Sequence, residues 1–160
     1  MYHITPDINN VAKHGLMSPR DLYENDRSAF KHVYDRYKQR AKAHSYEDVL
    51  NYLDNSPKRQ PLSSRCIFWS FIPRKLMPYV PDTAGTEIDV PLKVIKKYAL
   101  GSPILVEGSK LTQISWDDLK ANYKAYTNAA LQGAQLKPKG RLLYSRIPHI
   151  AVDSRVMSVG

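Results

Sequence analysis

The chain has 160 residues, which is the size of one compact domain, and 42% of them are hydrophobic and 24% charged. This composition excludes a disordered chain, and the single cysteine excludes a disulfide scaffold. No apolar run reaches the roughly 18 residues of a membrane span, and the start MYHITPDINN lacks the pattern of a secretory signal, so we expect a cytoplasmic protein with no membrane contact. The unusual property is the net charge of +9, from 24 basic and 15 acidic residues.

The first third of the chain predicts one strand followed by helices. Residues 1–5 read as a strand that stops at Pro6, and residues 8–14 as a short helix closed by Gly15. Apolar residues at helical spacing predict an amphipathic helix from residue 26 or 28 to 44, and Ser45 is typical of the N-cap of a shorter helix that ends before Ser56. We therefore expect a helical insertion at about 21–54.

The rest of the chain mixes strands and helices. The apolar, aromatic run 65–72 predicts a central buried strand, and 104–107 a second strand. Helices are expected at 92–100 and from a cap at Ser115 to Gly133, and one or two strands in 141–152. Together these elements predict an α+β fold in which residues 1–160 form a single domain, with a small twisted mixed sheet and flanking amphipathic helices.

The positive charge is concentrated in two stretches. Residues 54–80 carry five basic residues and one acidic residue, and residues 137–160 carry the same numbers. If the two stretches are neighbours in the fold, they form a positive face that attracts nucleic acid or a phosphate-rich cofactor; a merely solvated basic surface is the alternative. The candidate nucleic-acid-binding residues are Arg59, Arg74, Lys75, Lys139 and Arg141.

Common catalytic and metal-binding motifs are absent from the sequence. It has no GxGxxG, GxxxxGK[ST], HExxH or CxxC pattern, and its five histidines occur singly, so no metal site is predicted. Cys66 precedes the apolar run 67–72, where a buried packing role is commoner than a nucleophilic one.

Three short segments resemble a known family. A strand ending in Tyr2-His3-Ile4-Thr5, followed by a short helix and His14-Gly15-Leu16, resembles the first motif of the ADP-ribosyltransferase superfamily. That superfamily includes DNA-targeting ADP-ribosyltransferase toxins, rifampicin ADP-ribosyltransferases and RNA 2′-phosphotransferases. Residues 67–71 (IFWSF) resemble its central strand, and residues 142–150 (LLYSRIPHI) its late strand and Ile-Pro turn.

The resemblance implies a split sheet and an NAD site. It places His3 on the adenosine ribose, the Thr5 backbone on the nicotinamide amide, and Trp69 or Ser70 in the nicotinamide pocket. Trp69 and Ser70 point to opposite faces of a strand, so only one of them can line the cleft.

The catalytic carboxylate departs from the family pattern. Where the family has a Glu at the start of the late strand, this chain has Gly140 and Arg141. Glu107 is the replacement of the same type, and Arg146 with His149 is an alternative by analogy with the RNA 2′-phosphotransferases. The candidate catalytic residues are therefore His3, Glu107 and Arg146.

Two classes of function are left open by the sequence. The first is an NAD-binding, ADP-ribosyltransferase-like protein that transfers ADP-ribose to nucleic acid or to a host protein. The second is a non-enzymatic basic protein that binds nucleic acid, or a small phage-type regulator that binds a protein partner through the apolar Phe30–Ala41 helix face.

Overall fold

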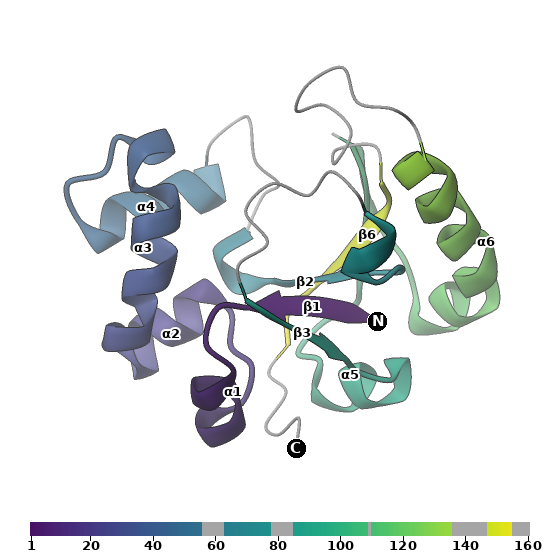
Figure 1. The fold of residues 1–160 in the computed structure, drawn as a ribbon, viewed down its shortest axis with the longest axis horizontal. Helices are drawn as coiled ribbons and strands as arrows, with labels where there is room; N and C mark the ends of the chain where they lie inside the picture. Colours follow the sequence, from purple (N-terminus) through teal and green to yellow (C-terminus); the bar gives the residue numbers. More distant parts are fainter. Residues whose placement is uncertain (56–62, 78–84, 109, 136–146, 155–160) are drawn as a thin grey trace.

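The computed structural model describes residues 1–55, 63–77, 85–108, 110–135 and 147–154. Within these residues, α-helices flank a six-stranded sheet, which confirms the predicted single-domain α+β class (Figure 1). The helices are α1 (Ile8–His14), α2 (Pro19–Asn25), α3 (Arg27–Ala41), α4 (Tyr46–Asn55), α5 (Leu92–Tyr98) and α6 (Trp116–Gln135), with short 3-10 helices η1 (Ser63–Arg65) and η2 (Arg74–Leu76). The strands are β1 (Tyr2–Thr5), β2 (Ile67–Ser70), β3 (Thr86–Asp89), β4 (Ile104–Glu107), β5 (Lys110–Gln113) and β6 (His149–Val152).

The sheet is antiparallel throughout its described pairings. Its strand order is β3-β1-β2-β6-β4-β5, so the strand predicted to be central, β2, does lie inside the sheet. The expectation of a mixed sheet was wrong: every pair of neighbours runs in opposite directions, which the order of strands along a sequence does not determine.

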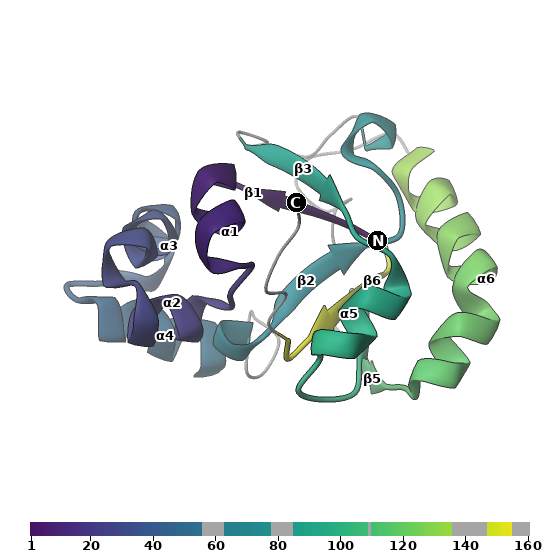
Figure 2. The same cartoon turned by 90° about the horizontal axis from the view of Figure 1, so that it is seen from below.

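The sheet is split between β1 and β2. β1 pairs with β3 over all four of its residues, but with β2 it forms the single pair Tyr2↔Ser70. Figure 2 shows the two strands meeting near the N-terminus and separating toward the other end of β1. The backbone of β2 therefore has no β1 partner beyond Ser70.

The main hydrophobic core covers one face of the sheet. Because side chains alternate along each strand, Trp69, Ile150 and Leu105 share this face, and all three are buried. Val11 of α1, Ile95 of α5 and the buried residues of α6 join the same cluster. A smaller cluster of Cys66, Val106 and Ala151 lies away from it.

Helices α2 to α4 pack around a cluster of their own, formed by Phe30, Val49, Leu50 and Leu53. Figure 1 shows these three helices together to one side of the sheet. Asp26 ends α2 and also caps α3 by accepting a hydrogen bond from the Ala29 amide. α3 ends at Ala41, earlier than predicted, because Lys42 adopts a left-handed conformation with φ 49°.

Other boundaries differ from the predictions in instructive ways. α1 has the predicted bounds and ends at Gly15 with φ 81°. α6 passes through Gly133, which is buried inside the helix instead of ending it. α2, β3 and β5 were not predicted, and residues 141–146 of the expected late strand lie outside the described residues. None of the described helices is both long and apolar enough to cross a membrane.

Candidate functional site

His3 lies at the split in the sheet. Its Nδ1 is 2.8 Å from the carbonyl oxygen of Phe68, in the part of β2 that β1 no longer pairs with. Since a carbonyl oxygen can only accept, Nδ1 carries the proton and donates it. Nε2 then holds a lone pair, and it forms no hydrogen bond with any residue that the structure describes.

The imidazole of His3 is held in its neutral form. Burial lowers its pKa more than the hydrogen bond to Phe68 raises it, and the charge of Arg36 lowers it further. His3 is nonetheless only half-buried. The site therefore offers a neutral ring with a fixed tautomer and an acceptor nitrogen that a hydroxyl group can reach.

Trp69 supports His3 and does not line an open pocket. The two ring centroids are 5.5 Å apart at 52°, and Trp69 has no exposed surface. The role of Trp69 in a nicotinamide pocket stays a prediction, and in this structure the indole belongs to the core cluster. Its Nε1 is buried without a hydrogen-bond partner among the described residues.

Thr5 and Ser70 are both occupied by local turns. Thr5 is buried, and its Oγ1 accepts a hydrogen bond from the Asp7 amide at the start of α1. Ser70 Oγ donates to the Ile72 carbonyl at 2.9 Å and accepts from the Ile72 amide at 3.2 Å. Ser70 also pairs with Tyr2 and so lies on the face opposite to His3 and Trp69.

His149 contacts Phe68 from β6, on the other side of β2 from β1. The backbone oxygen of Phe68 accepts the hydrogen bond from His3, whereas the Phe68 ring lies beside His149, with 5.8 Å between the ring centroids. His149 Nδ1 lies 3.2 Å from the Ile147 carbonyl, and the residue pairs with Ser70 across β2 and β6. Because His149 pairs with Ser70, its side chain lies on the face opposite to His3, and the structure does not bring the two histidines together.

Arg36 is the site residue that the sequence did not indicate. It belongs to α3, more than 30 positions along the chain from β1, yet its charge acts on His3. It is exposed, its guanidinium lies 5.6 Å from the Tyr37 ring centre, and it forms no ion pair with the described part of the chain. Only the tertiary arrangement of α3 and β1 brings these two residues near each other.

The structure does not bring Glu107 to His3. Glu107 is at the end of β4, and β2 and β6 lie between β4 and β1 in the sheet. It is exposed and pairs with Lys110 across the β4–β5 hairpin, which turns at Gly108 with φ 64°. Its catalytic role stays a prediction, and the structure does not place it with His3, because a sequence position does not say which strands lie between.

The predicted basic residues are only partly described. Arg74 begins η2, and its backbone amide donates to Glu87 at 2.6 Å while its guanidinium donates to the Gly85 carbonyl at 3.2 Å, so Arg74 is tied to β3. Lys75, the next residue, is exposed. Arg59, Lys139, Arg141 and Arg146 lie outside the described residues.

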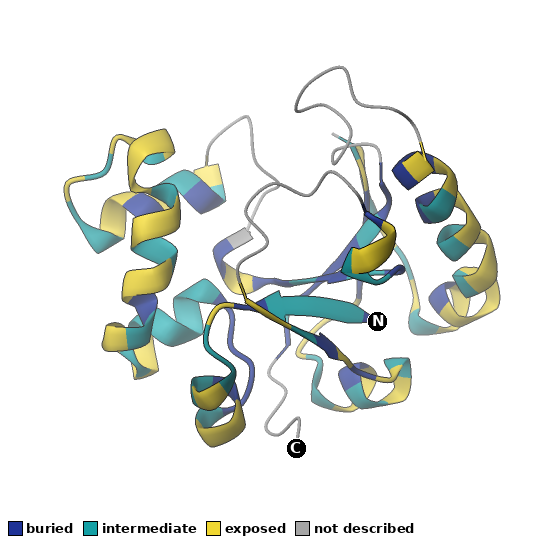
Figure 3. Ribbon diagram, in the orientation of Figure 1, coloured by how far each residue is buried: buried dark blue, intermediate teal, exposed yellow. Residues whose placement is uncertain are grey.

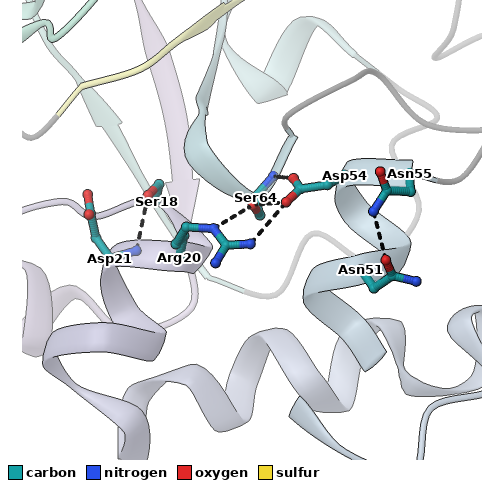
Figure 4. Close-up of polar contacts among 7 residues, drawn as sticks. All are labelled: Ser18, Arg20, Asp21, Asn51, Asp54, Asn55 and Ser64. Carbon is teal, nitrogen blue, oxygen red and sulfur yellow. Dashed lines mark hydrogen bonds and ion pairs between the residues drawn. The ribbon is translucent and has the colours of Figure 1, made fainter. Parts of the chain in front are cut away.

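A polar network holds the chain just before β2. Asp54 at the end of α4 accepts hydrogen bonds from the Ser64 amide at 3.0 Å, the Ser64 hydroxyl at 2.8 Å and Arg20 of α2 at 3.1 Å (Figure 4). Ser64 is completely buried and belongs to η1, which leads into β2. The network therefore fixes α2 and α4 to the strand whose carbonyl His3 contacts.

The other polar features form no second site of this kind. An open hollow of about 470 Å³ lies between the end of α3 and α4, lined by polar residues such as Lys42 and His44. Asp48 in this hollow already accepts hydrogen bonds from the His44 amide and, with Ser45, forms the helix cap. No group of three or more metal-binding side chains occurs among the described residues.

The apolar face of α3 is packed against its neighbouring helices. Phe30 is completely buried, and Val33, Tyr34, Tyr37 and Ala41 pack against the cluster that α4 completes. Binding of a protein partner through this face, one of the alternatives from the sequence, stays a prediction, although these residues already pack in this cluster.

Comparisons with known proteins add no relative: no protein-family model matches the chain, and neither a curated protein nor a solved structure matches it.

Proposed function

We propose that the chain binds NAD at the split between β1 and β2 and transfers its ADP-ribose to an acceptor. The observation that carries this proposal is the placement of His3 on a strand that separates from β2, with Nδ1 bonded to Phe68 and Nε2 without a described partner. A ribose hydroxyl needs an acceptor of this kind. The resemblance of residues 2–5 and 67–71 to the ADP-ribosyltransferase motifs supports the same assignment.

Two further properties fit a dinucleotide. Arg36 supplies a positive charge on the side of His3, as a pyrophosphate requires, and a guanidinium can bind phosphate oxygens through two donors at once. The neutral state of His3 avoids a second charge that would have to be desolvated when the ribose covers it.

The proposed transfer breaks the bond between the nicotinamide nitrogen and C1′ of the ribose. Nicotinamide leaves with the bonding electron pair, an acceptor nucleophile supplies the pair for the new bond to C1′, and its proton passes to solvent. His3 binds the adenosine ribose and so positions the dinucleotide while C1′ of the nicotinamide ribose develops positive charge. Glu107 has no part in this proposal, because it lies on β4.

The test is NAD binding and transfer by the full chain with a matched pair of variants. His3→Gln removes the acceptor nitrogen, whereas His32→Gln changes an exposed histidine of α3. We expect wild type and His32→Gln to show an NAD-dependent rise in melting temperature and release of nicotinamide in the presence of nucleic acid or cell extract, and His3→Gln to lose both. Absence of any NAD-dependent shift and of any label transfer in the wild type would overturn the proposal.

A second candidate function, nucleic-acid binding, is supported by a different observation. It depends on the charge of α3 and needs no NAD.

A further inference from the structure

The basic residues of the helical part are gathered on one helix. Residues 19–55 contain seven basic and seven acidic residues, so the segment as a whole is neutral. Six of the seven basic residues fall between positions 27 and 42, where Asp35 is the one acid. Of these six residues, Arg27, Lys31 and Lys38 follow one stripe of α3 and Lys42 caps its end; we call these four the α3 basic face. Arg36 and Arg40 lie on another side of the helix.

All six side chains are exposed, and folding does not require them. Figure 3 shows the outer side of α3 coloured as exposed along most of its length. The helix is held instead by its inner stripe, in which Phe30 is fully buried against α4. Among the described residues, the ion pairs of these side chains are the exposed contacts of Asp35 with Lys31 and Lys38, which contribute little to stability.

The spacing of the basic face is unfavourable for an isolated helix. Arg27 and Lys31 are four residues apart within α3, so two like charges face each other on this stripe. Such pairs destabilise a helix in water, and an anionic partner would relieve their repulsion.

Aromatic rings are interleaved with the basic side chains. The guanidinium of Arg27 lies 4.2 Å from the ring centre of Tyr23, and the ammonium of Lys38 lies 5.9 Å from that of Tyr34. These contacts restrain long, flexible side chains before a ligand arrives. Restrained cations beside tyrosines are the combination used by proteins that bind nucleic-acid strands.

The length of the face suits an extended polyanion. From Arg27 to Lys38 an α-helix rises about 17 Å, which corresponds to about five nucleotides of a stacked strand. A membrane surface fits less well, because an interfacial helix must insert its apolar side, and the apolar side of α3 is covered by α4.

We propose that the α3 basic face binds the phosphate backbone of nucleic acid. This site is separate from the NAD site in residues and in assay, since it requires neither His3, nor Arg36, nor a nucleotide cofactor. It also differs from the nucleic-acid-binding residues expected from the sequence, which lie in other segments.

Fluorescence anisotropy of labelled 20-nucleotide DNA, single-stranded and duplex, tests the proposal on the full chain without NAD. One variant changes Lys31, Lys38 and Lys42 to Gln. Its control changes Lys93, Lys96 and Lys97, which are also exposed but lie on α5, so both variants lose the same net charge. Far-UV circular dichroism and melting temperature establish that both are folded.

We expect the α3 variant to bind DNA at least about tenfold more weakly than the wild type at 50 mM salt. In a plot of log affinity against log salt concentration, the magnitude of its slope should be smaller by about two. The α5 variant should bind like the wild type. Equal weakening in both variants, unchanged binding by the α3 variant, or no binding by the wild type would each overturn the proposal. So would equally tight binding to polyglutamate or to phosphatidylserine vesicles, because these would identify another class of partner.

Discussion

Replacing Asp54 by Ala should destabilise the protein far more than replacing Asp35, although both carboxylates bind basic groups. Asp54 accepts two bonds from Ser64 and one from Arg20, and its side chain is only 12% exposed. Asp35 accepts from Lys31 and Lys38 in solvent, with 41% of its side chain exposed. The two residues therefore separate the effect of burial from that of charge pairing.

The magnitude follows from what each substitution leaves behind. Without Asp54, the amide and hydroxyl of the fully buried Ser64 lose their acceptor, and each unsatisfied group costs about 1–3 kcal/mol. Allowing for local relaxation, we expect Asp54→Ala to lower the free energy of unfolding by about 3 kcal/mol. Asp54→Asn, which keeps one acceptor oxygen, should lose about half as much. Asp35→Ala should leave the unfolding midpoint unchanged.

Urea unfolding followed by tryptophan fluorescence measures these differences. Desolvation raises the pKa of Asp54, but the bonds from Ser64 and Arg20 outweigh it, so the pKa lies below its ordinary value. The carboxylate therefore stabilises the fold at neutral pH, and the difference between wild type and Asp54→Asn should shrink as the pH falls below about 4. Equal losses for Asp54→Ala and Asp35→Ala would refute the reasoning.

Three other predictions concern single residues. Burial raises the pKa of Cys66 to about 11, so the thiol should react with a disulfide reagent only after denaturation; fast reaction of the native protein would contradict its placement. Burial lowers the pKa of His3 in the folded protein, so as the pH falls the histidine is protonated first in the unfolded chain. The free energy of unfolding should therefore fall below about pH 6.5, and it should fall less in His3→Gln. Identical pH profiles for the two proteins would contradict this. Gly85 has φ 140°, and a Cβ there would lie 2.6 Å from the Thr5 carbonyl oxygen, so Gly85→Ala should lower the free energy of unfolding in urea by more than about 1 kcal/mol. Gly101→Ala should lower it little, because its Cβ would have an ordinary 3.8 Å contact. The reverse order would contradict the placement of β3 on β1.

Local signals in the sequence were sufficient for several elements. Asp7 and Gly15 mark the two ends of α1, and the apolar run around Trp69 predicts an internal strand, because caps and continuous apolar runs act within a few residues. β5 (Lys110–Gln113) is an edge strand with one apolar residue, so its pattern is too weak to predict a strand. β3 (Thr86–Asp89), also at an edge, has only Ile88 buried.

The candidate site depends on distances that no local pattern contains. His3 could be named from its motif, but its bond to Phe68 follows from the splitting of β1 and β2. The charge of Arg36 acts on His3 only through the tertiary arrangement, and Glu107 is remote because β2 and β6 lie between β1 and β4. The charge of α3 was missed because the acids of α2 and α4 cancel it when the segment is summed.

The most direct test of the account is a titration of histidine-labelled protein with NAD, observed through the imidazole ring resonances. Five histidines give five signals, and a His3→Gln variant assigns that of His3. The account predicts that NAD shifts the His3 signal and leaves those of the exposed His32 and His44 unchanged. A His3 signal that does not move at saturating NAD would contradict the assignment of the β1–β2 split as the nucleotide site.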